Sequence, residues 1–347
     1  MRSDTIEVMK GIGIILVVLY HSMVRNIPSI TINWDNGLFN IIASFFMMMF
    51  MMISGYLVYG KVGNFKWTLS KLIKFLIPTL VFMILYWIFS NKDIVLPFGR
   101  YILFNISYGF QSSPLWYIWC LMLCYIIAHL AEKARLKIKL PFEYQFGLLL
   151  MIILALPVYS FGFNFVKWYG IFFFIGYMFK HSIEMDKGKI FKFMKLASYS
   201  SLILFPLSIY LTNWMIPYQD MKYGYNGYTI IANSIQGGRT DLVLVMFGMA
   251  ILGTLFINSI ARLIKGKLAK PLIYLGRVSL PIYLIHIFFV GIVHNYILAT
   301  LISISIPIIV YEFLKRYKWC NFILFGGTDI PITLSDKLGG WYAKAQE

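Results

Sequence analysis

The chain has 347 residues, of which 60% are hydrophobic and 13% are charged, and its mean hydropathy is +0.74. Soluble domains carry about 25% charged residues, so this composition excludes a soluble globular protein. The formal net charge of +17 does not indicate nucleic-acid binding, because the basic residues lie in short connections between apolar runs, where they orient a membrane protein and contact anionic headgroups. We therefore expect an all-α, polytopic integral membrane protein whose partners include membrane lipid and no nucleic acid.

About ten apolar runs are long enough to cross a bilayer. A hydrocarbon core of about 30 Å requires roughly 17 to 25 residues per helix. The predicted spans are residues 9–26, 37–59, 71–90, 113–131, 146–162, 164–180, 196–216, 240–260, 272–292 and 297–314. No small-residue cleavage site follows the first run, so it is predicted to remain as a helix and not to be a signal peptide. Residues 1–318 are then one membrane-embedded domain, and residues 319–347 are a mildly polar C-terminal cytoplasmic tail.

The basic residues are distributed unevenly between the two sides of this arrangement. Of the 31 Lys and Arg residues, 25 fall on one side and six on the other. Cytoplasmic connections are enriched in Lys and Arg, so both termini are predicted to be cytoplasmic in a multi-pass protein of the cell (inner) membrane. The longest outer connection, residues 213–241, is rich in Tyr, Gly and Asn and could cover an outward-facing cavity.

The three cysteines, Cys120, Cys124 and Cys320, form no metal-type spacing with the five histidines, and two of them lie four residues apart in one apolar run. We interpret them as small core residues, and we expect neither a disulfide nor a metal cofactor.

The first apolar run carries two ionisable residues, Lys10 and His21, eleven positions apart. At about 100° per residue both point to the same helix face, and at about 1.5 Å per residue His21 lies about 16 Å beyond Lys10, near mid-membrane. An ionisable group at that depth requires a polar cavity or a partner, and imidazole suits proton transfer near neutral pH. The alternative is a neutral histidine hydrogen-bonded between helices.

The third run begins with Lys71 and Lys74, which share one helix face because they lie three residues apart. With Lys10 they would form a basic mouth for a phosphorylated cytoplasmic cosubstrate. Taken alone, these lysines fit equally well as anchors that set the topology.

The ninth run places Ser279, Tyr283 and His286 at spacings of four and three, as a polar stripe on an apolar helix. If this helix starts at Gly276, His286 lies about 15 Å deeper and reaches the level of His21. A hydrogen-bonded His286 that only holds two helices together is the alternative.

Several blocks of the sequence resemble the acyltransferase family 3 membrane proteins. They follow the family's order and span most of the chain. The blocks are Glu7 to Ser22, with the family's eleven-residue spacing from a basic residue to a histidine; Phe50 to Leu57; the stretch of Lys71, Lys74 and Pro78; Ser113 to Ile118; and Gly276 to His286.

This resemblance implies a ten-helix fold that transfers an acyl group, usually acetyl from cytoplasmic acetyl-CoA, to a hydroxyl of an envelope glycan or related acceptor. It assigns Lys10 and His21 to the catalytic motif, and Lys10, Lys71 and Lys74 to the CoA phosphates. On the acceptor side, we expect the substrate to contact four residues: Trp116, Ser279, Tyr283 and His286.

The sequence departs from the family pattern in two respects. All three basic positions are lysine where relatives often have arginine, which would bind phosphate with a planar fork. Positions where many relatives carry acidic side chains hold Met48, Leu121 and Met122, so no carboxylate partner for His21 is identified.

We therefore predict an O-acyltransferase acting on a carbohydrate hydroxyl, in which His21 is the general base or itself carries the acyl group. A transporter or exporter of a surface polysaccharide or its intermediate is the first alternative, because a mid-membrane histidine also suits proton-coupled transport. A non-catalytic membrane partner is the second, and it leaves the alignment of Lys10 with His21 unexplained.

Overall fold

A computed structural model of the chain describes residues 4–27, 37–90, 97–110, 113–141, 144–145, 149, 152–153, 155–156, 160–185, 189–212 and 240–327. All regular secondary structure in these segments is helical. The helices are α1 (Asp4–Asn26), α3 (Gly37–Ala43), α4 (Phe46–Val58), α5 (Phe65–Ser90), α6 (Phe98–Ser107), α7 (Trp116–Ile138), α9 (Phe163–Met185), α10 (Lys189–Leu211), α13 (Thr240–Leu263), α14 (Ala269–Arg277), α15 (Ser279–Ile285), α16 (Tyr296–Leu314) and α17 (Lys318–Phe325), with 3-10 turns at Gly266–Leu268 and His286–Phe288.

Seven helical segments within the described residues are long and apolar enough to cross a membrane, or eight if a bent pair counts as one span. The seven are Asp4–Asn26, Gly37–Val58, Phe65–Phe89, Trp116–Ile138, Lys192–Leu211, Val243–Leu263 and Tyr296–Leu314. The polytopic all-α membrane fold is thereby confirmed. The count of ten and the cytoplasmic termini stay predictions, because most of the span expected at 146–162 lies outside the described residues and α9 is not among the seven.

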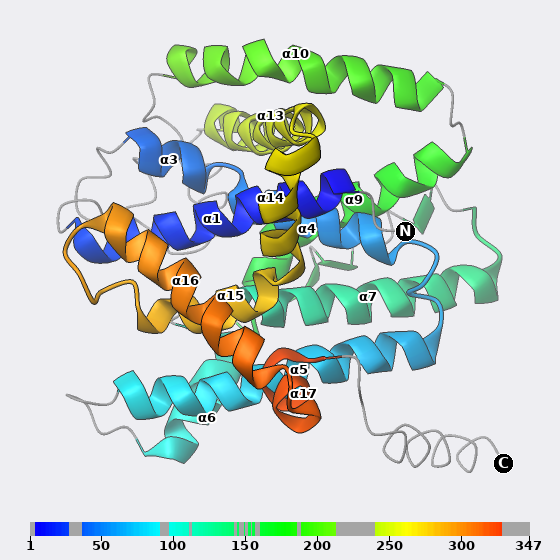
Figure 1. Cartoon of the computed structure of the whole chain (residues 1–347). Helices are drawn as coiled ribbons and strands as arrows, with labels where there is room; N and C mark the ends of the chain where they lie inside the picture. Colours follow the sequence, from blue (N-terminus) through cyan, green and yellow to red (C-terminus); the bar gives the residue numbers. More distant parts are fainter. Residues whose placement is uncertain are drawn as a thin grey trace, which may run out of the picture.

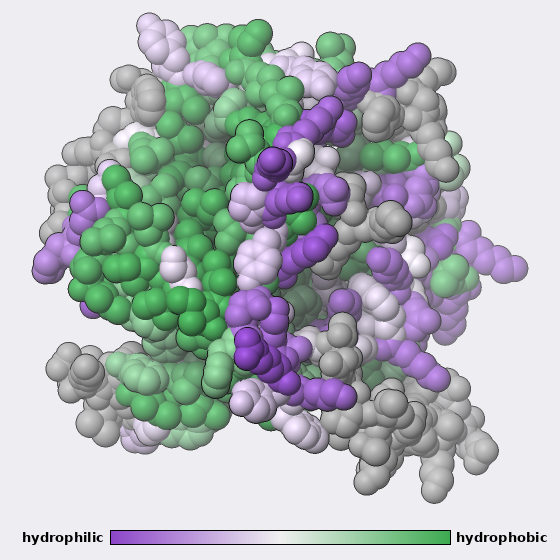
Figure 2. Space-filling model, viewed as in Figure 1, coloured by the Kyte–Doolittle hydropathy of each residue, from purple (hydrophilic) through white to green (hydrophobic). Residues whose placement is uncertain are grey.

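The surface divides into an apolar and a polar part. Figure 2 shows a broad hydrophobic area on the left of the molecule and hydrophilic side chains gathered on the right, where α1 begins (Figure 1). Helix α16 exposes Ile297, Leu301 and Ile309. Exposed apolar side chains of this kind are expected where a helix faces lipid.

Helix α1 lies in the middle of the bundle, and α14 crosses it (Figure 1). The two backbones approach very closely, since a Cβ added at Gly11 would lie 2.1 Å from the carbonyl oxygen of Leu272, and one added at Gly276 would lie 2.0 Å from that of Glu7. Small residues allow such close approach between membrane helices. This contact fixes α14 against the part of α1 that carries Lys10.

The ninth predicted span is broken. The apolar run predicts a continuous helix over 272–292, whereas the structure has α14 and α15 on either side of Val278, with a bend of 57° between Gly266–Arg277 and Ser279–Phe288. Pro281 explains the break, because proline has no N–H to donate to the carbonyl of Arg277 and fits best in the first turn of a new helix. His286 consequently begins a 3-10 turn at the end of α15.

The chain after α16 packs back onto the bundle. Helix α17 lies against α5 and buries Phe322 and Phe325. The domain boundary expected at 318 stays a prediction, although Gly326 lies against the backbone of Lys74 in α5. Residues 328–347 of the expected tail, and 213–239 of the long outer connection, lie outside the described residues.

Candidate active site

A cavity of about 530 Å³ opens between helices from both ends of the chain. Lys10, Ile14 and Val17 of α1 form one wall, and most of the other lining residues come from α4, α5, α7, α14, α15, α16 and α17. The spacing of these α1 residues is that of one helix face. The cavity therefore follows the face of α1 on which the sequence analysis placed Lys10 and His21.

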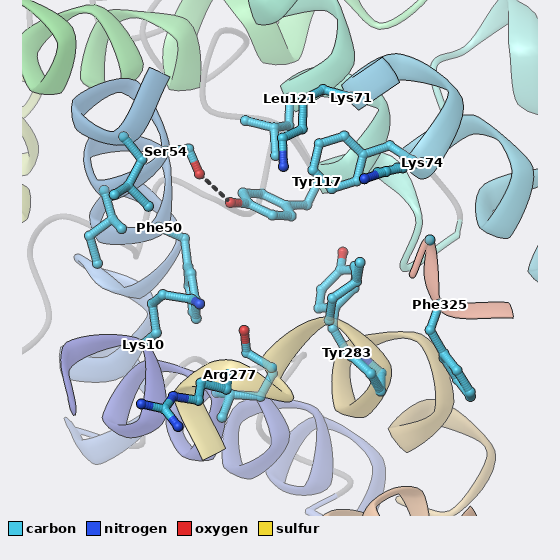
Figure 3. A pocket seen from close by; sticks show the side chains of 18 of the residues that line it. Lys10, Phe50, Ser54, Lys71, Lys74, Tyr117, Leu121, Arg277, Tyr283 and Phe325 are labelled. Carbon is cyan, nitrogen blue, oxygen red and sulfur yellow. Dashed lines mark hydrogen bonds between the residues drawn. The ribbon is translucent and has the colours of Figure 1, made fainter. Parts of the chain in front are cut away.

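One end of the cavity is strongly basic. Figure 3 shows Lys10 and Arg277 on one wall and Lys71 and Lys74 on the opposite wall. Lys61 is also among the lining residues, and none of the described lining residues is acidic. Behind the wall, Lys10 forms an ion pair of 3.1 Å with buried Glu7. Like charges that converge on a low-dielectric cleft attract anions strongly, so this end is suited to a ligand with several negative charges.

Aromatic and hydroxyl groups line the inner part. The Tyr117 hydroxyl lies 3.4 Å from the Ser54 hydroxyl, with the hydrogen bond drawn in Figure 3. The Tyr283 hydroxyl donates to the carbonyl of Pro114, and the rings of Tyr117 and Tyr283 are in edge contact at 5.7 Å. These contacts hold the tyrosines in fixed orientations at the inner end of the basic cavity.

His21 and His286 meet beyond this inner end. His21 follows Val17 by four residues on α1 and is not among the lining residues. Its ring lies 5.2 Å from that of His286, with an angle of 49° between their planes. The ring of His286 is also 5.9 Å from that of Tyr283. Tyr283 thus lies between the basic cavity and the two histidines.

His286 is completely buried, and the backbone fixes its tautomer. Its Nδ1 lies 2.7 Å from the carbonyl oxygen of Tyr283 and 3.2 Å from that of Ile282. A carbonyl oxygen only accepts hydrogen bonds, so Nδ1 must carry the proton. The Nε2 atom is then an acceptor in the neutral ring, and no group of the described residues donates a hydrogen bond to it.

The structure places the predicted site residues in two groups. Lys10, Lys71 and Lys74 line one cavity. Ser279 and Tyr283 line the same cavity, although the sequence predicted that these two contact the acceptor substrate.

The remaining predicted residues lie elsewhere. His21 and His286 form the ring pair, while Trp116 packs against Phe165 at 4.8 Å and Tyr169 at 4.7 Å and does not line the cavity.

Several residues that line the cavity were not predicted from the sequence to be part of the site. Lys61 follows α4 and was counted only as a topology anchor, and Asn321, Gly326 and Gly327 fall in the segment read as a tail. Arg277 could have been predicted from the sequence, because it lies two residues before Ser279 in the block from Gly276 to His286. The others approach the cavity only through tertiary packing.

Within the described residues, no three His, Cys, Asp or Glu side chains converge on a point where a metal could bind. No curated protein and no solved structure matches the chain at a significant level. A family model described as an acyltransferase domain matches residues 4–314. Because this match spans most of the chain, including every cavity-lining helix except α17, the protein belongs to the acyltransferase family 3 of membrane acyltransferases.

Proposed function

We propose that the protein is an O-acyltransferase that takes an acyl group, most simply acetyl, from cytoplasmic acyl-CoA and transfers it to a hydroxyl of an envelope glycan or a related acceptor. The observation that carries this proposal is the cavity with five cationic lining residues and no acidic one in the described part of its wall. Its volume of about 530 Å³ suits a cofactor-sized ligand.

Coenzyme A fits the distribution of charge along this cavity. It carries its phosphates at one end and its thioester at the end of a long, uncharged arm. Lysine ammonium groups and an arginine fork bind phosphate oxygens through charge-assisted hydrogen bonds. With the phosphates among Lys10, Lys71, Lys74 and Arg277, the arm extends along Ile14 and Val17 towards the histidines.

In the proposed reaction, the acceptor oxygen attacks the thioester carbonyl while His21 takes the hydroxyl proton. The new C–O ester bond forms, the C–S bond breaks, and the proton passes to the departing CoA sulfur. Because general-base catalysis contributes typically 10²–10⁴-fold, this role gives the mid-membrane position of His21 a function. Ser279 and Tyr283, which line the cavity between the cations and the histidines, would then contact the arm of the donor.

The donor half of the proposal is tested with purified protein in lipid nanodiscs and acetyl-CoA alone, by following thiol release with water as the acceptor. We expect slow thiol release that saturates with acetyl-CoA. In a Lys71→Ala/Lys74→Ala variant the donor KM should be at least tenfold higher, since the two lost phosphate contacts together contribute about 1.4 kcal/mol or more of binding free energy. Lys66→Ala is the matched control, because Lys66 is exposed on the same helix and does not line the cavity.

The acceptor half is tested in cells by comparing envelope glycans of a deletion strain and its parent by mass spectrometry. Loss of an acetyl increment supports transfer to a glycan. A polysaccharide exporter, the alternative that the sequence left open, instead predicts loss of the whole polymer from the surface and no thiol release by the purified protein.

A further inference from the structure

The Nε2 atom of His286 has no hydrogen-bond donor in the part of the chain that the structure describes. The atom is buried, and the two backbone hydrogen bonds at Nδ1 leave it as a lone-pair acceptor. A buried acceptor without a donor is destabilising by about 1–3 kcal/mol. A group at this position that donates a hydrogen bond would remove that penalty.

His21 is a candidate donor on another helix. Its ring centroid lies 5.2 Å from that of His286. A hydrogen bond between two ring nitrogens requires a separation of about 3 Å, and each nitrogen lies roughly 1 Å from its ring centroid, as follows from standard bond lengths. The separation of the two centroids is therefore short enough for an N–H of the half-buried His21 ring to reach Nε2 when the two ring edges face each other.

Two tyrosine hydroxyls on or beside α15 are already engaged. The Tyr86 hydroxyl of α5 donates to the carbonyl of Leu284 at 2.6 Å, and that of Tyr283 donates to Pro114. No acidic side chain is in contact with either histidine in the interactions of the described residues. The positions where relatives carry carboxylates hold the buried apolar residues Met48, Leu121 and Met122.

We propose that His286 is the positioning residue for His21: its Nε2 lone pair accepts the N–H of one His21 nitrogen and so leaves the other nitrogen unprotonated for the acceptor hydroxyl. In hydrolases with a serine–histidine pair, a carboxylate fixes the tautomer of the histidine in the same way. Here a second imidazole, whose own tautomer is fixed by backbone carbonyls, performs that role. This assignment rests on the proposed function of His21 as the base.

The first test compares two substitutions of His286 in the full-length protein in nanodiscs. His286→Gln retains an oxygen at about the position of Nε2, so it can still accept from His21, although it cannot take a proton. His286→Leu has a similar size and no acceptor. We expect kcat for thiol release to fall roughly 10- to 100-fold in the Leu variant, as for loss of one hydrogen bond to a group that becomes charged, and to be largely retained in the Gln variant. The donor KM should change in neither.

A double substitution supplies the control. In a His21→Ala protein, His286→Leu should cause no further loss of kcat, because the partner is already absent. Equal losses in the Gln and Leu variants, or a further loss in the His21→Ala background, would overturn the positioning role in favour of a packing role or of direct proton transfer by His286.

A spectroscopic test does not depend on turnover. In protein labelled with ¹⁵N-histidine, the His21 ring, identified by its loss in His21→Ala, should give one fixed tautomer with a hydrogen-bonded N–H, and His286→Leu should convert it to a mixture. If this result is obtained while acetyl-CoA is not turned over, the proposed function fails, whereas the hydrogen bond between the two histidines stands. If the wild-type His21 ring is already a mixture of tautomers, the positioning role is wrong, whatever the activity.

Discussion

At the scale of single residues, the interval between Lys10 and His21 determines which face of α1 they share. The eleven-residue interval predicted one shared helix face, and Lys10, Ile14 and Val17 do line one cavity along that face. The same interval could not predict that the cavity ends before His21. That end depends on Tyr283, which reaches it from a distant part of the chain.

Replacing His21 tests its assignment as the base. We expect His21→Ala to lower kcat for transfer at least roughly a hundredfold, since general-base catalysis is lost, and to leave the thermal midpoint nearly unchanged because the ring is only half-buried. His294→Ala is the control, because His294 is exposed and lies in the connection before α16. Retention of more than about a tenth of wild-type activity is incompatible with this role.

The two cations that the sequence analysis did not assign to the donor yield a second prediction. Arg277→Ala and Lys61→Ala should each raise the donor KM several-fold, since each removes a charge that lines the cavity, and the effect should shrink in high salt because exposed charge pairs are screened. The kcat at saturating donor should remain. Steady-state kinetics at two ionic strengths measure both effects. Lys270→Ala is the control for Arg277, because Lys270 is exposed on the same helix and does not line the cavity. An unchanged donor KM would show that these charges serve topology alone.

At the scale of helices, the apolar runs located most of the described spans, because 17 or more apolar residues have few alternatives to crossing a membrane. The break at Val278 was readable in principle, since Pro281 removes a helical hydrogen bond. The contact between α1 and α14 was not readable, because a glycine in an apolar run does not reveal which backbone will pack against it.

Gly276→Ala should destabilise this helix pair. Its Cβ would lie 2.0 Å from the carbonyl oxygen of Glu7, so α1 and α14 must separate, and overpacking typically reduces the free energy of unfolding by about 1–3 kcal/mol. We expect a lower thermal midpoint in detergent and a higher donor KM, since Lys10 and Arg277 flank this contact.

Gly248→Ala on α13 is the matched control, because nothing lies within 4 Å of a Cβ added there. Alanine favours a helix over glycine by up to about 1 kcal/mol, so this variant should be unchanged or slightly stabilised. If Gly276→Ala were as stable as Gly248→Ala, the close approach of α1 and α14 would be refuted.

At the scale of the whole molecule, the uneven distribution of Lys and Arg predicts which connections between helices face the cytoplasm, and the structure shows which connections lie at the same end of the bundle. Gly291, which precedes α16, lies beside Arg25 at the far end of α1 from Lys10. The connection after α15 should therefore be on the outer side if Lys10 is on the inner side.

Thiol labelling in intact cells measures this sidedness. In a Cys320→Ser background, where Cys120 and Cys124 are buried, a cysteine at His294 should react with an impermeant reagent. Cysteines at Lys137 and Lys267 should react only after the cells are permeabilised. External labelling of Lys137 would contradict the alternation of helix directions on which the predicted cytoplasmic termini depend.

Helix α17 has a practical consequence for where this protein can be cut. The family match ends at residue 314, and a truncation at that point would appear to keep the complete domain. It would also remove Asn321, Phe325, Gly326 and Gly327 from the cavity wall. A Cβ added at Gly326 would lie 2.2 Å from the carbonyl oxygen of Lys74. This part of the wall therefore packs directly against the backbone of a lysine that is proposed to bind phosphate. A protein shortened to its matched domain would therefore retain its histidine pair and lose four residues of the cavity wall. Residue 327 is thus the earliest end point that keeps every described lining residue in an expressed fragment.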